Sequence, residues 1–374
     1  MPALTPDLLV VGLGAVGSAT VFHAAGRGAQ VIGIDRFDPP HHHGSTHGES
    51  RITRLAVGEG AEFVPLVQRS HQLWRELEAA SGESLFRACG GLVLARGDGA
   101  SPMHGQASFF DQTVAIAQAH GIGHERLDAA AIAARWPQFQ LRGDERGYFE
   151  PDAGYLRPEA CVAAHLSLAR QRGARIHTGE RMIGWRVDGH GLRVETDRAV
   201  YRPGDAVIAV GPWLPGLLGS TAPPLRVTRQ LLHWFDADCP ADYVDERFPI
   251  FIWSWGQAAG EVFYGFPDLG GGVKLATETD APCDPDRVER AVTAAESARF
   301  HARHITGRLR GVGPRLRRAA TCLYTQTPDA RFLIDRLETG GPIVVSACSG
   351  HGFKHSAAIG ERVASWKSHE TAVT

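Results

Sequence analysis

The chain begins with two short apolar runs separated by a glycine-rich turn. Residues 8–11 (LLVV) are uninterrupted apolar positions, which are typical of a buried parallel strand. The turn after them carries the pattern G-x-G-x-x-G, made by Gly12, Gly14 and Gly17. Small residues then predict a helix to about Ala25, and a second apolar run at 31–34 closes on Asp35. The opening of the chain therefore predicts a strand–helix–strand unit.

The remaining pattern alternates helical periodicity with strand-like runs. Helices are predicted at 62–78, 109–120, 127–135, 158–171 and 284–307, and from about residue 354 onward. Strands are predicted at 90–97, 181–187, 191–196, 206–213 and 342–347. Residues 225–280 hold several runs rich in β-branched and aromatic residues, the composition of a mostly antiparallel sheet. Gly350 and Gly352 form a second glycine-rich turn between a strand and a helix, and its N–H groups suit a developing negative charge.

This order of elements predicts an α/β protein with two domains. A discontinuous Rossmann-like nucleotide-binding domain is expected from residues 1–80, 150–218 and 320–374. A substrate domain with a large mixed or antiparallel β-sheet, flanked by helices, is expected from 81–149 and 219–319. A chain of 374 residues exceeds the size at which one core stops growing, so two domains are also the default expectation.

Composition and charge narrow the class of protein. The chain is 43% hydrophobic and 21% charged, with a net charge of −2, so no global field attracts nucleic acid or an anionic membrane. The first residues lack a basic region before the apolar run, and no apolar stretch is long enough to span a bilayer, so neither a signal peptide nor a membrane helix is expected. Six cysteines without a C-x-x-C pair favour a reducing, cytoplasmic setting.

The glycine turn has a physical role in binding a dinucleotide. Bare backbone at Gly14 lets a pyrophosphate approach, and the helix start offers it free N–H groups. Asp35 lies where an acid accepts hydrogen bonds from the hydroxyls of the adenosine ribose. The alternative is a glycine-rich turn that binds nothing, which the terminal acid and the whole strand–helix–strand context make less favoured.

A polar segment after this unit holds several basic side chains. Its histidines are His41, His42, His43 and His47. They allow either a metal site or a solvated loop, and the loop is favoured because adjacent histidines point different ways. Arg51 and Arg54 are spaced to share one face of a helix, and a surface pair of salt-bridging arginines is the alternative to a functional role.

Cys322 follows a basic cluster near the end of the chain. The cluster is Arg315, Arg317 and Arg318. Nearby guanidinium groups favour a thiolate, which is the nucleophilic form of cysteine. The residues alone favour a plain buried cysteine.

Four stretches together resemble one family. "HGSTHGESRITRLAVGEGAEFVPL", "YGFPDLGGGVKLATE", "TCLYTQTPDARFLID" and "SGHGFKHSAAIGE" occur in the order seen in monomeric sarcosine oxidase and N-methyltryptophan oxidase. These proteins are FAD-dependent amine oxidases of the D-amino-acid oxidase superfamily. The likeness runs from about residue 7 to about residue 365.

The resemblance implies an FAD site. The flavin is expected to be tethered through its 8α-methyl group to the sulfur of Cys322, and His47, Arg51 and Ser50 are expected near the flavin ring. The residues expected to contact FAD are Gly12, Gly14, Gly17, Asp35, Arg36, Ser45, Thr46, Ser50, Arg51, Gly211, Trp213, Cys322, Gly350, Gly352 and Lys354.

The resemblance also implies a substrate site. Arg54 and Lys354 match residues that bind the substrate carboxylate, a sensible clamp for an amino acid. Lys274 matches a lysine at the oxygen-reactive face of the flavin, where a cation stabilises superoxide; without the motif, a surface lysine is equally favoured. A family histidine is replaced by Glu278, which is expected to favour a cationic or hydrogen-bond-donating substrate group. A tyrosine pair is replaced by Phe263 and Tyr264, and both are expected to line the substrate side.

These implications predict an FAD-dependent oxidase of secondary amino acids. It would act on an N-methyl or cyclic amino acid and on O₂, give an imine that hydrolyses, and release H₂O₂. We expect a cytoplasmic monomer without metal, nucleic acid or membrane partners. One alternative is an oxidase or dehydrogenase of the same fold acting on primary, D- or pipecolate-like amino acids. A more distant alternative is a nucleotide-binding protein that uses FAD or NAD only as a sensor or structural ligand.

Overall fold

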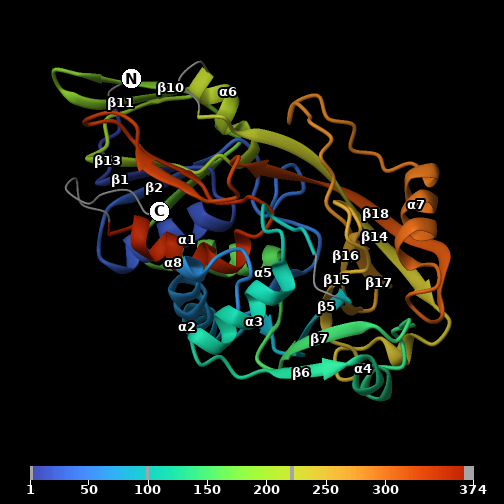
Figure 1. Ribbon diagram of the computed structural model, residues 1–374. Coiled ribbons are helices and arrows are strands. Elements are labelled where there is room, and N and C mark those ends of the chain that lie inside the picture. The colour runs from blue at the N-terminus through green and yellow to red at the C-terminus, as the bar shows by residue number, and fades with distance from the viewer. Residues whose placement is uncertain (1–2, 98–100, 220–222, 366–374) are drawn as a thin grey trace.

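Two large β-sheets organise the structure. The computed structural model describes residues 3–97, 101–219 and 223–365, and its strands form four sheets of six, eight, three and three strands. Figure 1 shows the six-stranded sheet with the N-terminal helix in one half and the eight-stranded sheet in the other. The predicted α/β class, with a Rossmann-like unit beside a large mixed sheet, is confirmed.

The six-stranded sheet is the predicted nucleotide-binding unit. Its order is β19 (Leu333–Arg336), β20 (Ile343–Ser346), β13 (Asp205–Ile208), β1 (Leu8–Val11), β2 (Val31–Asp35) and β9 (Arg175–Thr178). All neighbours are parallel except β19 and β20, which run antiparallel. Its strands come from the start, the middle and the end of the chain, so the unit is discontinuous in sequence, as expected.

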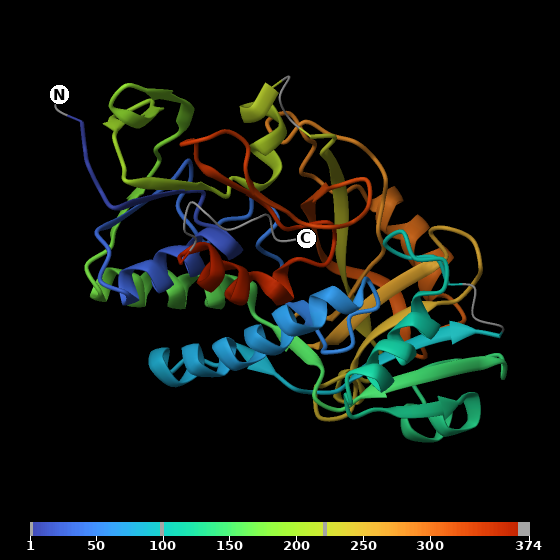
Figure 2. The same ribbon diagram turned by 60° about the vertical axis from the view of Figure 1, so that its left-hand side comes forward.

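Both faces of this sheet are buried. Successive residues of β1 point to opposite sides of the sheet, and both sets pack in apolar clusters. Leu8 and Val10 pack in the cluster formed with the helices, whereas Leu9 and Val11 pack against a three-stranded sheet. The helices are α1 (Ala15–Gly26), α2 (Val64–Ser81), α5 (Pro158–Gln171) and α8 (Ser356–Val363). The covering sheet consists of β10 (Met182–Asp188), β11 (Gly191–Thr196) and β12 (Val200–Tyr201). Figures 1 and 2 both show α1, α5 and α8 gathered on one side of the sheet, so this half has three layers.

The eight-stranded sheet forms the second half. Its order is β18 (Val312–Gln326), β14 (Arg226–Ala237), β17 (Val273–Ala276), β16 (Val262–Asp268), β15 (Ile250–Ser254), β5 (Gly91–Arg96), β7 (Glu145–Glu150) and β6 (Glu125–Asp128). Only β15 and β5 pair in parallel. Helix α3 (Phe109–Ala119) packs in a cluster on one face, while α4 (Ala129–Arg135) and α7 (Ala294–Phe300) contribute to a cluster on the other. Helices therefore flank this sheet on both faces.

The expected helix at 284–307 is wrong over its first half. An Asp284 carboxylate accepts the N–H of Asp286, a local turn that competes with a helix, and Pro285 lies inside it. Helix α7 begins only after Thr293, whose hydroxyl and Glu296 form a reciprocal capping box, and the chain continues as a π-helix at His301–Ile305. The long strand β18 was not predicted, and the domain boundary expected at residue 320 lies inside it.

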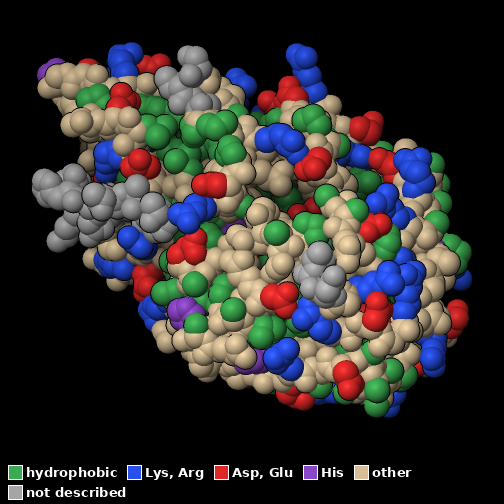
Figure 3. Space-filling view, viewed as in Figure 1, with side chains coloured by type: hydrophobic (Ala, Val, Ile, Leu, Met, Phe, Trp, Pro, Cys, Tyr) green, Lys and Arg blue, Asp and Glu red, His purple; other side chains and the backbone are tan. Residues whose placement is uncertain are grey.

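The remaining elements are short and lie close to the site. They are β3 (Arg51–Thr53), β8 (Gly154–Leu156) and β4 (Phe86–Arg87), which form the last sheet, and the 3₁₀ turns η2 (Gly211–Trp213) and η6 (Phe353–His355), with α6 (Leu214–Leu218) after η2. Figure 3 shows hydrophobic side chains gathered over the part that Figure 1 assigns to β10, β11 and α6. Within the described ranges, no helix is both long and apolar enough to cross a membrane.

Candidate functional site

The glycine turn after β1 brings two backbone segments into close contact. Gly12 has φ +86°, and a Cβ there would lie 2.5 Å from the carbonyl oxygen of Ala209 at the end of β13. A Cβ at Gly17 would lie 1.8 Å from the carbonyl oxygen of Gly12. Gly14 begins α1 without a side-chain cap. The turn therefore needs glycine for packing, and it leaves the N-terminal end of the helix open to an anion.

Asp35 faces this turn from the end of β2. Its carboxylate accepts the N–H of Leu13 at 2.7 Å and the N–H of Phe37 at 2.8 Å. The guanidinium of Arg36 lies over the rings of Phe37 and Trp213 and forms a 2.5 Å ion pair with Asp286. These contacts fix a carboxylate and two aromatic rings beside the glycine turn, an arrangement that suits an adenosine group.

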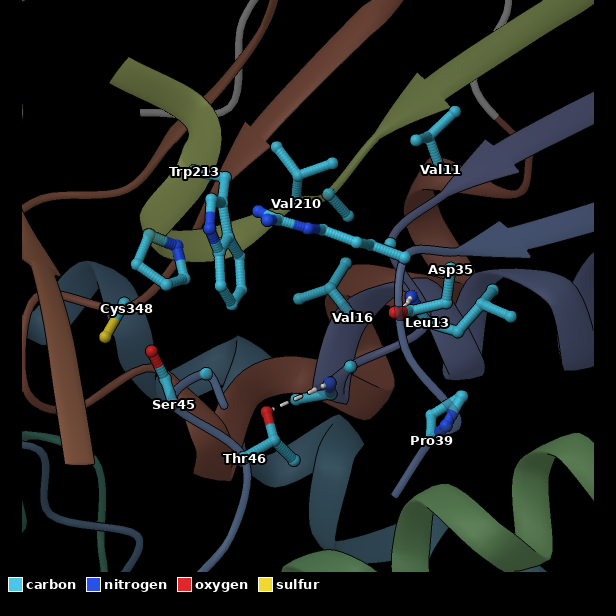
Figure 4. A pocket seen from close by; sticks show the side chains of 18 of the residues that line it. Val11, Leu13, Val16, Asp35, Pro39, Ser45, Thr46, Val210, Trp213 and Cys348 are labelled. Atoms are coloured by element: carbon cyan, nitrogen blue, oxygen red, sulfur yellow. Dashed lines mark hydrogen bonds between the residues drawn. The ribbon is translucent and has the colours of Figure 1, made fainter. Parts of the chain in front are cut away.

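A cavity of about 530 Å³ runs from the glycine turn toward the second half of the protein. The predicted residues that line it are Gly12, Gly14, Asp35, Arg36, Ser45, Thr46, Arg51, Gly211, Trp213, Gly350 and Gly352. Figure 4 shows Trp213 and Thr46 on opposite sides of this space, with Asp35 close to Leu13. The hydroxyls of Ser45 and Ser346 are buried without a hydrogen-bond partner among the described residues. Such hydroxyls and the bare glycine turn fit a large polar ligand such as FAD.

The predicted histidine segment lies beside this cavity. The ring of His43 stacks on Phe37 with ring centroids 4.2 Å apart, and His41 and His42 lie next to His43. Within residues 3–97, 101–219 and 223–365, no group of three or more His, Cys, Asp or Glu side chains is placed to hold a metal ion. The aromatic contacts give the segment a packing role along the cavity wall.

Cys322 is 1% exposed and lines a smaller cavity beside the first one. One terminal nitrogen of Arg51 lies 3.5 Å from its sulfur and donates at 2.7 Å to the carbonyl of Ser45. The other donates to the carbonyl of Ser50. Arg51 is therefore the cation in contact with this thiol.

The basic cluster expected to activate Cys322 points elsewhere. Arg315 and Arg317 pair with Asp236, and Arg318 pairs with Glu49 at 2.9 Å. Each of these guanidinium groups is therefore held by a carboxylate, and even Arg318, the nearest of them along β18, lies four residues from Cys322, roughly 13 Å along the strand. The explanation from neighbouring sequence is wrong, and the contact with Arg51 replaces it.

Lys274 is 1% exposed on β17. Its ammonium donates to the carbonyls of Gly48 at 2.6 Å and Ser50 at 2.7 Å, and to the hydroxyl of Ser50 at 3.1 Å. Burial and then the charge of Arg51 lower the pKa of Lys274 well below its usual value. Three acceptors match the three N–H groups of an ammonium, so these hydrogen bonds favour the charged form that burial opposes. The alternative of a surface lysine is thereby excluded.

His47 lies near the same cluster as a neutral side chain. Burial, followed by the charges of Arg51 and Lys274, lowers the pKa of His47 to about 3. Its Nε2 atom is buried without a hydrogen-bond partner among the described residues. An uncharged imidazole with an unused nitrogen is suited to a hydrogen bond with a ligand.

A second cavity of about 70 Å³ adjoins the first. Four residues line both of them: Arg51, Tyr324, Gly350 and Phe353. The hydroxyls of Tyr264 and Tyr324 lie 3.2 Å apart at this smaller cavity. Of the predicted site residues, Ser50, Arg54, Tyr264, Lys274, Glu278, Cys322 and Lys354 line it.

The two residues expected to bind the substrate carboxylate, Arg54 and Lys354, both contact the carboxylate of Glu59 in this structure. Arg54 pairs with Glu59 at 2.9 Å and also donates to the carbonyl of Ala56, while the ammonium of Lys354 lies 3.4 Å from Glu59. Burial raises the pKa of Glu59, but the charges of Arg54 and Lys354 hold it well below its usual range. Arg54 and Lys354 therefore converge on one carboxylate, which is the geometry that a substrate carboxylate would need.

The predicted role of Phe263 at the substrate site is wrong. Phe263 is 0% exposed and packs with Phe251 and Trp253 in the core of the eight-stranded sheet, because neighbouring residues of β16 point to opposite faces. Only Tyr264 faces the cavity.

A substitution at Phe263 is therefore expected to affect stability alone. Phe263→Leu should lower the free energy of unfolding by about 1–2 kcal/mol, measured by urea denaturation, because it leaves space in a packed core. The KM for an amino acid substrate should stay unchanged. Tyr264→Phe is the matched change on the other face, and it should alter KM with little effect on stability. A changed KM in Phe263→Leu would contradict this placement.

The residues of the smaller cavity that were not predicted include Glu59, His104 and Tyr324. Tyr324 lies two residues after Cys322, so strand alternation would have placed both on one face. Glu59 lies within the "GEG" of a motif already noted. His104 lies in a loop without a regular pattern, and nothing in the local sequence points to it.

The fold and the site define a class of protein. A cavity suited to an adenine dinucleotide leads to a small charged cavity that holds a buried thiol, a buried lysine and two basic groups. This is the arrangement of an enzyme that brings a small anionic substrate to a dinucleotide cofactor.

Comparison with known proteins identifies the family. The sequence model of the DAO family, described as FAD dependent oxidoreductase, matches residues 7–366. The monomeric sarcosine oxidase of Streptomyces avermitilis is 37% identical over 367 residues, covering 96% of this chain and 93% of that protein. The N-methyl-L-tryptophan oxidase of Salmonella arizonae is 33% identical and covers 98% of this chain and 95% of its own. The open form of NikD, an amino acid oxidase, has a TM-score of 0.83 at 26% identity, covering 97% of this chain and 93% of its own.

This chain belongs to the DAO family of FAD dependent oxidoreductases. The resemblance to sarcosine and N-methyltryptophan oxidases, predicted from four motifs, is confirmed, and so is the prediction of a flavin-dependent enzyme of the amine oxidase type. The residues around the larger cavity fit FAD, since they include the glycine turn, Asp35 and Arg51, while Cys322, in contact with Arg51, lines the smaller cavity.

Proposed function

We propose that the protein oxidises a secondary amino acid, either N-methylated or cyclic, and passes the electrons to O₂. The observation that carries this proposal is the shared wall between the two cavities. Arg54 and Lys354 line the smaller cavity, which adjoins the cavity expected to hold the flavin. Support also comes from the relatives, which are sarcosine and N-methyl-L-tryptophan oxidases.

The chemistry divides between the cofactor and the chain. When bound, FAD accepts a hydride equivalent from the carbon next to the amine nitrogen and returns the electrons to O₂ as H₂O₂. The amine becomes an imine, and water hydrolyses it to an aldehyde and an amino acid when an N-methyl group is oxidised. Arg54 and Lys354 orient the substrate by its carboxylate, so the oxidisable carbon is held at a fixed distance from the shared wall.

The remaining side chains act through their own charge or through hydrogen bonds. Lys274 supplies a buried positive charge that favours the first electron transfer to oxygen, because superoxide is an anion. The Tyr264 and Tyr324 hydroxyls lie where they can hydrogen-bond the neutral amine. Arg51 lines both cavities and Glu278 lines the smaller one, whereas His47 lines neither and could act on the flavin only through Arg51 and Lys274 beside it.

We also infer that the flavin is covalently attached to Cys322. The supporting geometry is the contact of Arg51, whose terminal nitrogen lies 3.5 Å from the sulfur that would add to the 8α-carbon. The sulfur also lies 3.6 Å from the carbonyl of Ser45, a residue of the larger cavity.

A substrate panel tests the proposed reaction. Purified yellow protein is mixed with N-methylglycine, N-methyl-L-tryptophan, L-pipecolate, L-proline, glycine and D-alanine, and H₂O₂ is measured with a peroxidase-coupled dye. We expect the secondary amino acids to give peroxide at the highest kcat/KM. A preference for glycine or D-alanine would contradict the proposal in favour of a primary amino acid oxidase. Bleaching of the flavin by a secondary amino acid without peroxide release would indicate a dehydrogenase.

A further inference from the structure

A tight hairpin carries an unpredicted histidine into the smaller cavity. The N–H groups of Met103 and Gln106 donate to each other's carbonyls at 3.0 and 2.9 Å. The two residues between them, His104 and Gly105, have φ of +48° and +77°, as in the mirror-image turns that join two strands. A left-handed conformation is uncommon for a residue with a side chain, so the hairpin holds His104 in a constrained position.

Both ring nitrogens of His104 meet carboxylates. Nδ1 lies 3.2 Å from Glu59, and Nε2 lies 2.5 Å from Glu278. An ionised carboxylate only accepts hydrogen bonds, so serving both requires two N–H groups, which only the imidazolium form provides. Burial would lower the pKa of His104, yet Glu278 and Glu59 raise it to about 9. The side chain is 5% exposed, so this is a charge held inside the protein.

The neighbouring histidine does not share this role. The ring of His351 lies 5.5 Å from that of His104, and its Nε2 atom bonds the carbonyl of Ala330 at 2.8 Å. Burial lowers the pKa of His351 to about 3. His351 is therefore neutral, and His104 carries the charge on this wall.

Hydrogen bonds and ion pairs join five charged side chains into one network: Arg54, Lys354 and His104 are basic, while Glu59 and Glu278 are acidic. Burial lowers the pKa of Lys354 to about 8 against the effect of Glu59, so it remains mostly protonated at neutral pH. The network therefore has a net charge of one positive unit. Arg51 and Lys274 also line the smaller cavity, so an anion bound there meets further positive charge.

We propose that His104 is a specificity-determining residue whose positive charge offsets Glu278 and strengthens the binding of a substrate carboxylate in the smaller cavity. On its own, the negative charge of Glu278 would weaken the attraction of the smaller cavity for an anion. His104 restores that attraction from a different loop. This inference rests on the proposed function and deepens it, because it adds a charged residue that sets the affinity for the substrate carboxylate.

The packing around the pair leaves no room for a larger residue at Gly350. A Cβ at this position would lie 2.7 Å from Nε2 of His104 and 2.9 Å from Glu278, and its φ is +79°. Gly350 belongs to both cavities. The ion pair therefore lies beside a residue that lines both cavities, and His104 and Glu278 themselves line the smaller one.

A double-mutant cycle tests the charge balance. The dissociation constant of acetate is measured at pH 7 on flavin-loaded protein, by flavin absorbance and by calorimetry, so that no turnover is needed. His104→Asn removes the charge and suits the left-handed backbone, and it should weaken acetate binding about tenfold, the effect of one unit charge nearby. Glu278→Gln should tighten binding by about the same factor. The double variant should bind acetate within about threefold of the unchanged protein, because the two charges cancel.

Two controls separate charge from structure. Gln106→Ala alters the same hairpin, where the Gln106 amide donates to the carbonyl of Glu59, but leaves the charge unchanged. Gln106→Ala should leave the affinity for acetate unchanged. The affinity for acetamide, which carries no charge, should be the same in all variants. Equal weakening in Gln106→Ala, or a double variant weaker than either single change, would overturn the role of His104. Failure of acetate to bind the unchanged protein would instead overturn the proposed carboxylate substrate.

Discussion

Replacing Cys322 by serine is expected to release all of the flavin from acid-denatured protein. A serine hydroxyl has no accessible anion at neutral pH, so it cannot take the place of the thiolate in adding to the flavin. The unchanged protein should give a yellow pellet after precipitation with trichloroacetic acid, and the variant a colourless pellet with yellow supernatant. Mass spectrometry of the intact chain should show the corresponding loss of one flavin mass.

The matched control for this experiment is Cys348→Ser. Cys348 lines the larger cavity and is the second thiol near the expected flavin, as Figure 4 shows beside Ser45. It should retain a yellow pellet. Flavin that stays attached in Cys322→Ser but is lost in Cys348→Ser would move the attachment to the other cysteine. Colourless pellets from all three proteins would contradict covalent attachment.

Attachment of the flavin should also depend on Arg51. It is the cation in contact with Cys322, whereas the basic residues that precede the cysteine in sequence pair with Asp236 and Glu49. Attachment should therefore depend on a side chain more than 270 positions away in the chain and should tolerate loss of Arg317. The thiol's environment arises from the fold, and neighbouring residues in the sequence are a poor guide to it.

Local signals specified the nucleotide-binding unit well. The run 8–11, the glycine turn and Asp35 each have a backbone or hydrogen-bonding reason that is visible in the sequence. Parallel strands buried on both faces have continuous apolar runs, and the predicted helix at 158–171 has the bounds observed for α5. This part of the fold could be predicted because each element carries its own signal.

Other elements depend on contacts that the sequence does not display. The side chain of Arg290 donates to the carbonyls of His42 and His43, which ties residues 284–293 to the nucleotide-binding half in place of a helix. Polar and basic residues interrupt the apolar pattern of β18, because its outer residues are exposed at the edge of the sheet. Edge strands and interdomain connections lack a strong periodic signal.

The same division holds for the site. Motif residues such as Arg54, Lys274 and Lys354 were placed through the family resemblance, and the structure brings them to one small cavity. Phe263 was misplaced because a motif alignment ignores which face of a strand a residue occupies. His104 could not be found, because its contacts with Glu59 and Glu278 span 45 and 174 positions. Charge balance in a buried site is a property of the assembled fold.

Replacing Lys274 by methionine is expected to separate the two halves of the reaction. Methionine fills a similar volume without charge, so the reduced protein loses the cation that favours superoxide formation. In anaerobic stopped-flow mixing, reduction of the flavin by substrate should stay within about threefold of the unchanged protein, because the carboxylate is held by Arg54 and Lys354. Reoxidation on mixing with O₂ should slow by at least about 100-fold, the usual effect of removing one charge-stabilising donor.

Arg318→Met is the control for a general loss of charge. Arg318 lies over the ring of Trp234 at 3.9 Å, and Lys274 lies 5.6 Å from the same ring. Arg318 is half exposed, so solvent screens it and its removal should leave reoxidation unchanged. The three hydrogen bonds of Lys274 to Gly48 and Ser50 make it a fixed charge, which needs no rearrangement when oxygen arrives. Unchanged reoxidation in Lys274→Met would show that the flavin reacts with oxygen without that charge.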